Sequence, residues 1–153
     1  MDATVVEHIT MLQKALNRVN DDCRIVDFEH EHNYVDFLTV KSFVGSEVGA
    51  ANLLHPDGWK GPYLRDNFTM QEKQYEVLVN KQGHFVVPGK GVRLGNGNVI
   101  GTDIVLNRLS DIKELVTHPG GLQTIDGKAL AAQINVQGNP SERVLQHQVT
   151  MPT

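Results

Sequence analysis

The strongest constraint on the fold is an amphipathic pattern near the start of the chain. Apolar residues recur there at spacings of four, three, four and three, at Val5, Ile9, Leu12, Leu16 and Val19. Such a stripe predicts an α-helix over residues 3–20 that buries one face against a core. We expect Asp2 to cap the N-terminus of this helix and the run Asn20-Asp21-Asp22 to end it.

A second pattern, in the middle of the chain, is typical of antiparallel strands. YEVLVN (75–80) and HFVVPG (84–89) are separated by a short turn in which Gly83 is expected to adopt a positive φ. The following segment, GVRLGNGNVIG (91–101), contains the Asn-Gly pair that two-residue hairpin turns favour. Residues 75–101 are therefore predicted to form a three- or four-stranded antiparallel meander.

The segments between these two patterns are less regular. Residues 24–33 fit either a short strand or an extended loop. Apolar residues in 34–54 recur at near-helical spacing and predict one or two short helices, although Gly45 and Gly49 interrupt the pattern. Residues 55–69 are expected to form a loop.

The C-terminal third of the chain is predicted to contain short helices followed by a flexible tail. Ser110 is a candidate N-cap for a helix at 111–117, and DGKALAAQI (126–134) fits another short helix. The polar residues 138–153 are predicted to be a flexible tail. The whole pattern indicates one α+β domain over 1–137, in which the long helix packs on about four antiparallel strands beside short accessory helices.

Composition narrows the class of protein. The 153 residues suit a single domain, and 40% apolar residues provide a core. A formal net charge of −4 argues against a broad nucleic-acid-binding surface. The single cysteine, Cys23, excludes an internal disulfide and fits a half-buried small hydrophobe. No run of about 18 apolar residues is present, so the chain as given has no segment that would span a membrane.

Two histidines offer the main candidate for chemistry. His30 and His32 lie two residues apart in EHEH, so in a strand they face the same side and could share a metal. A zinc site needs a third ligand, for which His55, His84 and His118 are candidates. The alternative is a pair of solvated or hydrogen-bonded histidines in a polar loop.

Other catalytic and ligand-binding motifs are missing from the sequence. Gly95, Gly97 and Gly101 follow GxGxxxG, which is one residue longer than the dinucleotide fingerprint, and Gly89-Lys90 lacks the P-loop context. There is no GxSxG elbow, and no EF-hand loop surrounds the acidic run at 20–22. No catalytic residue is predicted, and we expect the protein not to be an enzyme.

The densest stretch is HPDGWKGPYLRD (55–66), which holds the only tryptophan, Trp59. Gly58 and Gly61 permit close backbone approach, and Pro62 fixes the turn. Trp59 offers a large apolar face, and Tyr63 and Leu64 can pack beside it. These residue types predict a crossover that clamps the helix to the sheet, rather than an active-site loop.

Two motifs in this order resemble a known family. ALNRVNDDC (15–23), followed by GWKGPYL (58–64) ahead of antiparallel strands, resembles the pseudopilins of bacterial type II secretion systems, especially the major pseudopilin, a relative of type IV pilins. The resemblance covers roughly residues 3–100. It implies a non-enzymatic structural subunit that assembles with other pseudopilin subunits into a periplasmic filament for protein secretion, in contact with the secretion machinery.

The resemblance also defines candidate positions and departures. Its structural and interaction residues would be Trp59, Gly61, Pro62, Tyr63 and Leu64 in the crossover, with Leu12 and Leu16 on the helix. The family's hydrophobic N-terminal helix half, which anchors subunits at the periplasmic face of the inner membrane, has no counterpart in the chain. The calcium loop of major pseudopilins also has no match, so no cofactor is assigned. Two alternatives stay open: a histidine-metal protein or small hydrolase using His30 and His32, and a soluble pilin-like adaptor.

Overall fold

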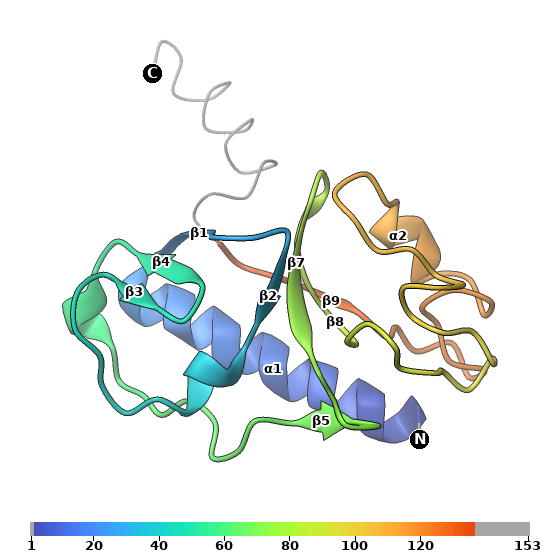
Figure 1. Ribbon diagram of the computed structural model, residues 1–153, viewed down its shortest axis with the longest axis horizontal. Helices are drawn as coiled ribbons and strands as arrows, with labels where there is room; N and C mark the ends of the chain where they lie inside the picture. Colours follow the sequence, from blue (N-terminus) through green and yellow to red (C-terminus); the bar gives the residue numbers. More distant parts are fainter. Residues whose placement is uncertain (1, 137–153) are drawn as a thin grey trace, which may run out of the picture.

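A long helix lies across antiparallel sheets in the computed structural model, which describes residues 2–136 (Figure 1). Helix α1 spans Asp2–Cys23. The α+β prediction is therefore confirmed, although the helix is longer than expected at both ends. Asp2 already belongs to the helix, and its carboxylate accepts a hydrogen bond from the Gly95 N–H at 2.9 Å instead of acting as the predicted N-cap. The predicted tail, 138–153, lies outside the described residues.

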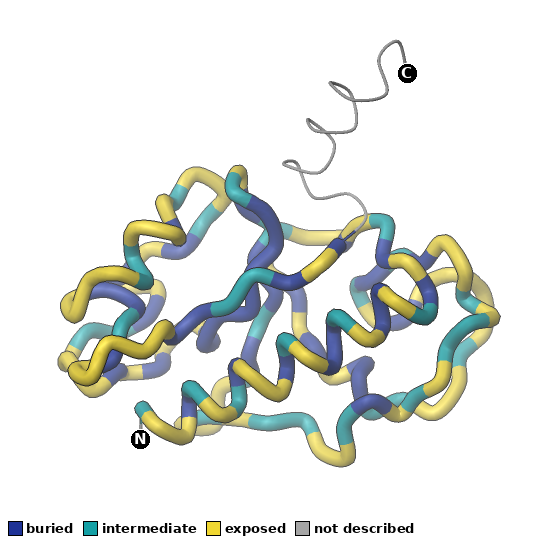
Figure 2. Tube along the Cα trace, turned by 180° about the vertical axis from the view of Figure 1, so that it is seen from behind, coloured by how far each residue is buried: buried dark blue, intermediate teal, exposed yellow. Residues whose placement is uncertain are grey.

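The predicted stripe of α1 forms the centre of the core. Its five members are each at most 2% exposed: Val5, Ile9, Leu12, Leu16 and Val19. Burial of each such side chain contributes about 1.5–3 kcal/mol. Buried and exposed positions alternate along the helix (Figure 2), so α1 packs on the domain along one face and leaves the other face open. Cys23 is fully buried, whereas the sequence predicted a half-buried residue.

The main sheet has four antiparallel strands in the order β2-β7-β8-β9. They are β2 (His32–Tyr34), β7 (Glu76–Asn80), β8 (Gly83–Val87) and β9 (Ala132–Ile134). The predicted hairpin is confirmed: β7 pairs with β8, and Gly83 at the turn has φ 134°. The two outer strands come from distant parts of the chain.

The prediction that the sheet lies within 75–101 is therefore wrong in its second half. A tight turn does form, in which the Leu94 N–H donates to the Asn98 carbonyl, and Gly97 has φ 88°. Only an isolated antiparallel bridge joins Arg93 to Val99, however. The edge of β8 that a third meander strand would need is already paired with β9.

A second sheet replaces the helices expected in 34–54. Its order is β1-β4-β3, with strands β1 (Ile25–Phe28), β4 (Ala51–Leu53) and β3 (Glu47–Val48). The helical content of this region is one short 3-10 helix, η1 (Asp36–Thr39). Gly49, at φ 59°, lies in the β3–β4 turn, so the glycine that weakened the helical pattern forms a hairpin. Residues 55–69 are loop, as predicted, apart from η2 (Pro56–Gly58), and β5 (Thr69–Met70) pairs with β6 (Lys73–Gln74).

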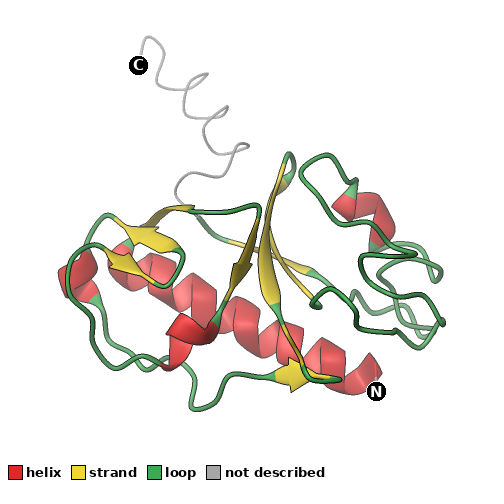
Figure 3. Ribbon diagram, viewed as in Figure 1, coloured by secondary structure: helices red, strands yellow, loops and turns green. Residues whose placement is uncertain are grey.

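The C-terminal part is mostly loop rather than helix (Figure 3). Helix α2 covers only Ile112–Leu115. Its N-cap is Asp111, whose carboxylate accepts from the Glu114 N–H at 3.1 Å, whereas the predicted cap, Ser110, donates to the Val105 carbonyl. The prediction of a helix at 126–134 is wrong, because this segment makes a turn and then enters β9. Pairing with β8 overrides the helical preference of its alanines.

The outer edge of β9 is covered by α1. Gln13 Nε2 donates to the Gln133 carbonyl, and Asn17 Oδ1 accepts from the Asn135 N–H, each at 2.8 Å. The two amides are four residues apart and so lie on the same helical face. Edge strands with unpaired backbone groups favour association with other chains, so this contact protects one end of the main sheet.

Candidate functional site

The tryptophan segment contacts the C-terminal end of α1. Trp59 is half-buried and donates from Nε1 to the Val40 carbonyl at 3.0 Å. Its ring meets the rings of Phe43 and Tyr63 edge-on, with centroid distances of 5.2 and 4.8 Å. Edge-to-face geometry is favourable for aromatic pairs. The indole therefore joins the crossover to residues 40–43, with part of the ring buried in the domain.

Tyr63 connects this cluster to the helix. Its hydroxyl donates to Asp22 Oδ2 at 2.7 Å and accepts from the Lys60 N–H at 3.0 Å. The Arg18 guanidinium lies 5.3 Å from the centre of the Tyr63 ring. Burial, reinforced by the hydrogen bond to Asp22, raises the pKa of Tyr63 well above its ordinary value. The phenol therefore stays protonated and acts as a permanent donor to α1.

The glycines of the segment allow the backbone to approach closely. A Cβ at Gly58 would collide with the Asp22 carbonyl oxygen, and a Cβ at Gly61 would lie 2.5 Å from Trp59 Nε1. The Gly61–Pro62 peptide is cis, and the Tyr63 and Leu64 N–H groups both donate to the Leu38 carbonyl. The segment is thus hydrogen-bonded to η1 and to α1 together.

The predicted structural residues divide into two groups. Trp59, Gly61, Pro62, Tyr63 and Leu64 come together at the end of α1, whereas Leu12 and Leu16 are fully buried and serve packing alone. Three partners of the segment were not predicted from the sequence: Asp22, Arg18 and Val40. Asp22 lies 41 residues before Tyr63, and no local spacing signals this contact.

The two candidate metal-binding histidines line one pocket of about 560 Å³. His32 Nδ1 lies 2.9 Å from Glu76 Oε1. The candidate third ligands lie elsewhere: His55 is exposed just ahead of η2, His84 is buried on β8, and His118 lies 3.3 Å from Glu114. Over residues 2–136, no group of three metal-ligating side chains assembles, so the metal interpretation finds no third ligand in this part of the chain.

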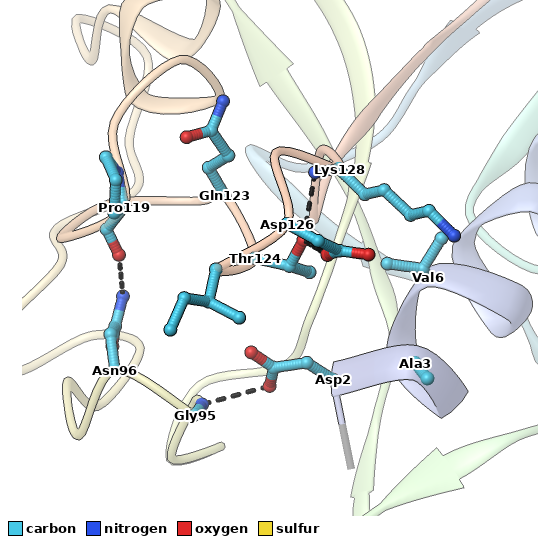
Figure 4. A pocket seen from close by; sticks show the side chains of 11 residues that line it. Asp2, Ala3, Val6, Gly95, Asn96, Pro119, Gln123, Thr124, Asp126 and Lys128 are labelled. Atoms are coloured by element: carbon cyan, nitrogen blue, oxygen red, sulfur yellow. Dashed lines mark hydrogen bonds between the residues drawn. The ribbon is translucent and has the colours of Figure 1, made fainter.

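A cavity lies where α1 begins (Figure 4). Its volume is about 680 Å³, and it lies between the first turn of the helix, the turn at 95–96 and the loop 119–128. The Asp2 carboxylate accepts a hydrogen bond from the Gly95 N–H, which joins the helix to the turn, and the Thr124 hydroxyl accepts from the Lys128 N–H within the loop. Ile125 is fully exposed beside it. The cavity has room for apolar side chains at the start of the helix.

Together, fold and site define an α+β domain whose N-terminal helix is clamped at its C-terminal end by an aromatic crossover. Within residues 2–136, no helix combines the length and hydropathy needed to cross a membrane. Comparison of the chain with protein-family models, with curated proteins and with solved structures finds no match.

Proposed function

We propose that this chain is the globular part of a non-enzymatic, pilin-like structural subunit resembling a pseudopilin of a bacterial type II secretion system. In this role it assembles with other pseudopilin subunits into a periplasmic filament for protein secretion. The observation that carries the proposal is the crossover at 58–64, whose Tyr63 bonds to Asp22 at the end of α1. The two motifs that carry the resemblance are thus in direct contact.

The open face of α1 supports a role in assembly. Its exposed positions recur every three or four residues, at Ala3, Glu7, Met11, Lys14 and Arg18. Glu7 and Lys14 form no ion pair within the described chain. They lie seven residues apart, or about 10 Å along the helix. A neighbouring helix shifted by about two turns would therefore bring a glutamate opposite a lysine.

The proposal sets the partners and the location. Subunits of this kind meet through their helices, and the globular surface determines register and partner choice. Membrane contact would come from a hydrophobic segment ahead of Asp2 that continues α1 and holds the subunit at the periplasmic face of the inner membrane. No cofactor and no nucleic acid take part.

The test is site-specific photo-crosslinking in a cell that expresses the whole gene with its native upstream sequence. A photoreactive residue at Glu7, Met11 or Lys14 is expected to give a ladder of adducts spaced by the subunit mass. Leu109 is the control, because it is 73% exposed and lies in the loop just before α2 rather than on α1. Monomer alone at every helix position would contradict the proposal, and a single adduct with an unrelated protein would indicate an adaptor instead.

A further inference from the structure

The two outer strands of the main sheet differ in whether their outer edges are covered. The edge of β9 is covered by Gln13 and Asn17 of α1, whereas β2 has β7 as its sole strand neighbour within residues 2–136. We propose that the open edge of β2 binds an extended, lysine- or arginine-rich segment of a partner protein, which adds to the main sheet as a fifth strand. This binding surface is separate from the open face of α1 and does not depend on filament assembly.

The backbone of β2 is oriented for such an addition. The Val79 N–H donates to the Glu31 carbonyl at 2.8 Å, which makes these two residues a hydrogen-bonded pair. Alternation in an antiparallel ladder places the next such pair at Asn33 and Val77. The N–H and C=O groups of His32 and Tyr34 therefore point away from β7. In the described chain, no other segment forms a backbone hydrogen bond with them.

The edge is also held in place before any partner arrives. The buried Asn33 side chain accepts from the His30 N–H at 2.9 Å and donates to the His30 and Val77 carbonyls. These bonds anchor the strand and the turn that precedes it. A preorganised edge loses little conformational entropy when a peptide pairs with it.

The groove beside the edge is acidic. It is the pocket of about 560 Å³ described above, between β2 and the β3–β4 turn at Gly49. Glu29, Asp36 and Glu76 line it, and no lysine or arginine does. Glu29 and Asp36 are exposed and form no side-chain hydrogen bond or ion pair among residues 2–136, whereas Glu76 contacts His32. Two carboxylates are thus free to bind cations.

The open edge of β2 and the acidic groove together determine which kind of peptide segment binds. Strand addition supplies affinity through main-chain hydrogen bonds, and the side chains beside the edge supply specificity. The carboxylates favour lysine or arginine at alternate positions of the added strand. Tyr34, which is 56% exposed on β2, offers an aromatic face to the aliphatic stem or the charge of such a residue. Nucleic acid is disfavoured by the same carboxylates.

The test uses a fluorescein-labelled decapeptide of alternating lysine and valine as the probe, with fluorescence anisotropy at low salt as the readout. We expect saturable binding that weakens with added salt. The Glu29→Gln/Asp36→Asn variant should weaken binding roughly fivefold. The matched control is Asp66→Asn/Glu72→Gln, which removes two exposed carboxylates outside the groove and should leave affinity unchanged.

Amide hydrogen exchange separates strand addition from simple charge attraction. With the peptide bound, the His32 and Tyr34 amides should gain protection, while the Asn33 amide, already bonded to β7, should change little. Binding without this protection would overturn the proposal. So would the absence of binding, equal binding of an alternating glutamate-valine peptide, or peptide-free dimerisation that protects the same two amides.

Discussion

The Tyr63 hydroxyl donates a hydrogen bond to the Asp22 carboxylate at 2.7 Å, across 41 residues of sequence. The Lys60 ammonium lies 3.7 Å from the other oxygen of the same carboxylate, and the Lys60 N–H donates back to Tyr63. One phenol therefore joins the last turn of α1 to the crossover, beside the ion pair between Lys60 and Asp22.

Replacing Tyr63 by phenylalanine should lower the free energy of unfolding by about 1.5–3 kcal/mol, because the bond lost has a charged acceptor. Urea denaturation measures the change. Tyr34→Phe is the matched control, since Tyr34 is 56% exposed and makes no side-chain hydrogen bond within residues 2–136. Equal midpoints for the Tyr63 variant and the wild type would show that the bond contributes no net stability.

Trp59 lies half inside the clamp, and its two contributions can be separated. Trp59→Phe keeps an aromatic ring but removes the donor to Val40, and should cost about 1 kcal/mol. Trp59→Ala also removes the contacts with Phe43 and Tyr63 and should cost about 2–3 kcal/mol, less than for a fully buried tryptophan. A loss under about 1 kcal/mol for Trp59→Ala would place the energetic role of the ring at a partner interface instead.

Gly58 is expected to tolerate no side chain. Gly58→Ala should destabilise the domain by about 1–3 kcal/mol, because its Cβ would collide with the Asp22 carbonyl, which is backbone and cannot rotate away. Gly120→Ala is the control: a Cβ there meets no atom within 4 Å, and the change should stay within about 0.5 kcal/mol. Thermal melts of both variants decide the matter, and similar melting temperatures would contradict the steric argument.

Removing the cover from β9 should promote self-association. Gln13→Ala/Asn17→Ala leaves the Gln133 carbonyl and the Asn135 N–H without their partners. We expect a loss of about 1 kcal/mol per bond and concentration-dependent oligomers in light scattering. Lys14→Ala, on the exposed side of the same helix, is the control. A double variant that stays monomeric at high concentration would show that the amides do not protect the edge.

His8 should make stability depend on pH. Its ring stacks on Phe68 with a centroid distance of 4.4 Å, and its Nδ1 lies 2.9 Å from the Tyr75 hydroxyl. Burial lowers the pKa of His8, against an opposing effect of Glu7. The unfolded chain therefore binds the proton more readily, so this contribution to stability is complete above about pH 6.5 and is lost as the pH falls below it.

The measurement is chemical denaturation of the wild type and of His8→Gln from pH 7.5 down to pH 5. The variant is expected to lose less stability over this range, since it lacks the group whose pKa differs between the two states. Parallel curves for the two proteins would contradict the assignment.

Local patterns predicted the elements that depend on neighbours in sequence. The stripe from Val5 to Val19 predicted α1, because a period of 3.6 residues makes one face apolar without reference to the rest of the chain. The β7–β8 hairpin followed from two apolar runs around Gly83. The crossover was also predictable as a clamp, since its glycines and aromatic residues indicate close packing, although its partners were not.

The rest depends on contacts between distant residues. By itself, the sequence determined an amphipathic helix, one hairpin and a tight aromatic turn. Only the tertiary structure decided that residues 132–134 form a strand, because β8 offers them an edge and alanine's helical preference is small beside a ladder of hydrogen bonds. It likewise decided that Tyr63 meets Asp22 and that β2 keeps an open edge beside three carboxylates. Such contacts join residues that are far apart in the sequence, so no local periodicity predicts them.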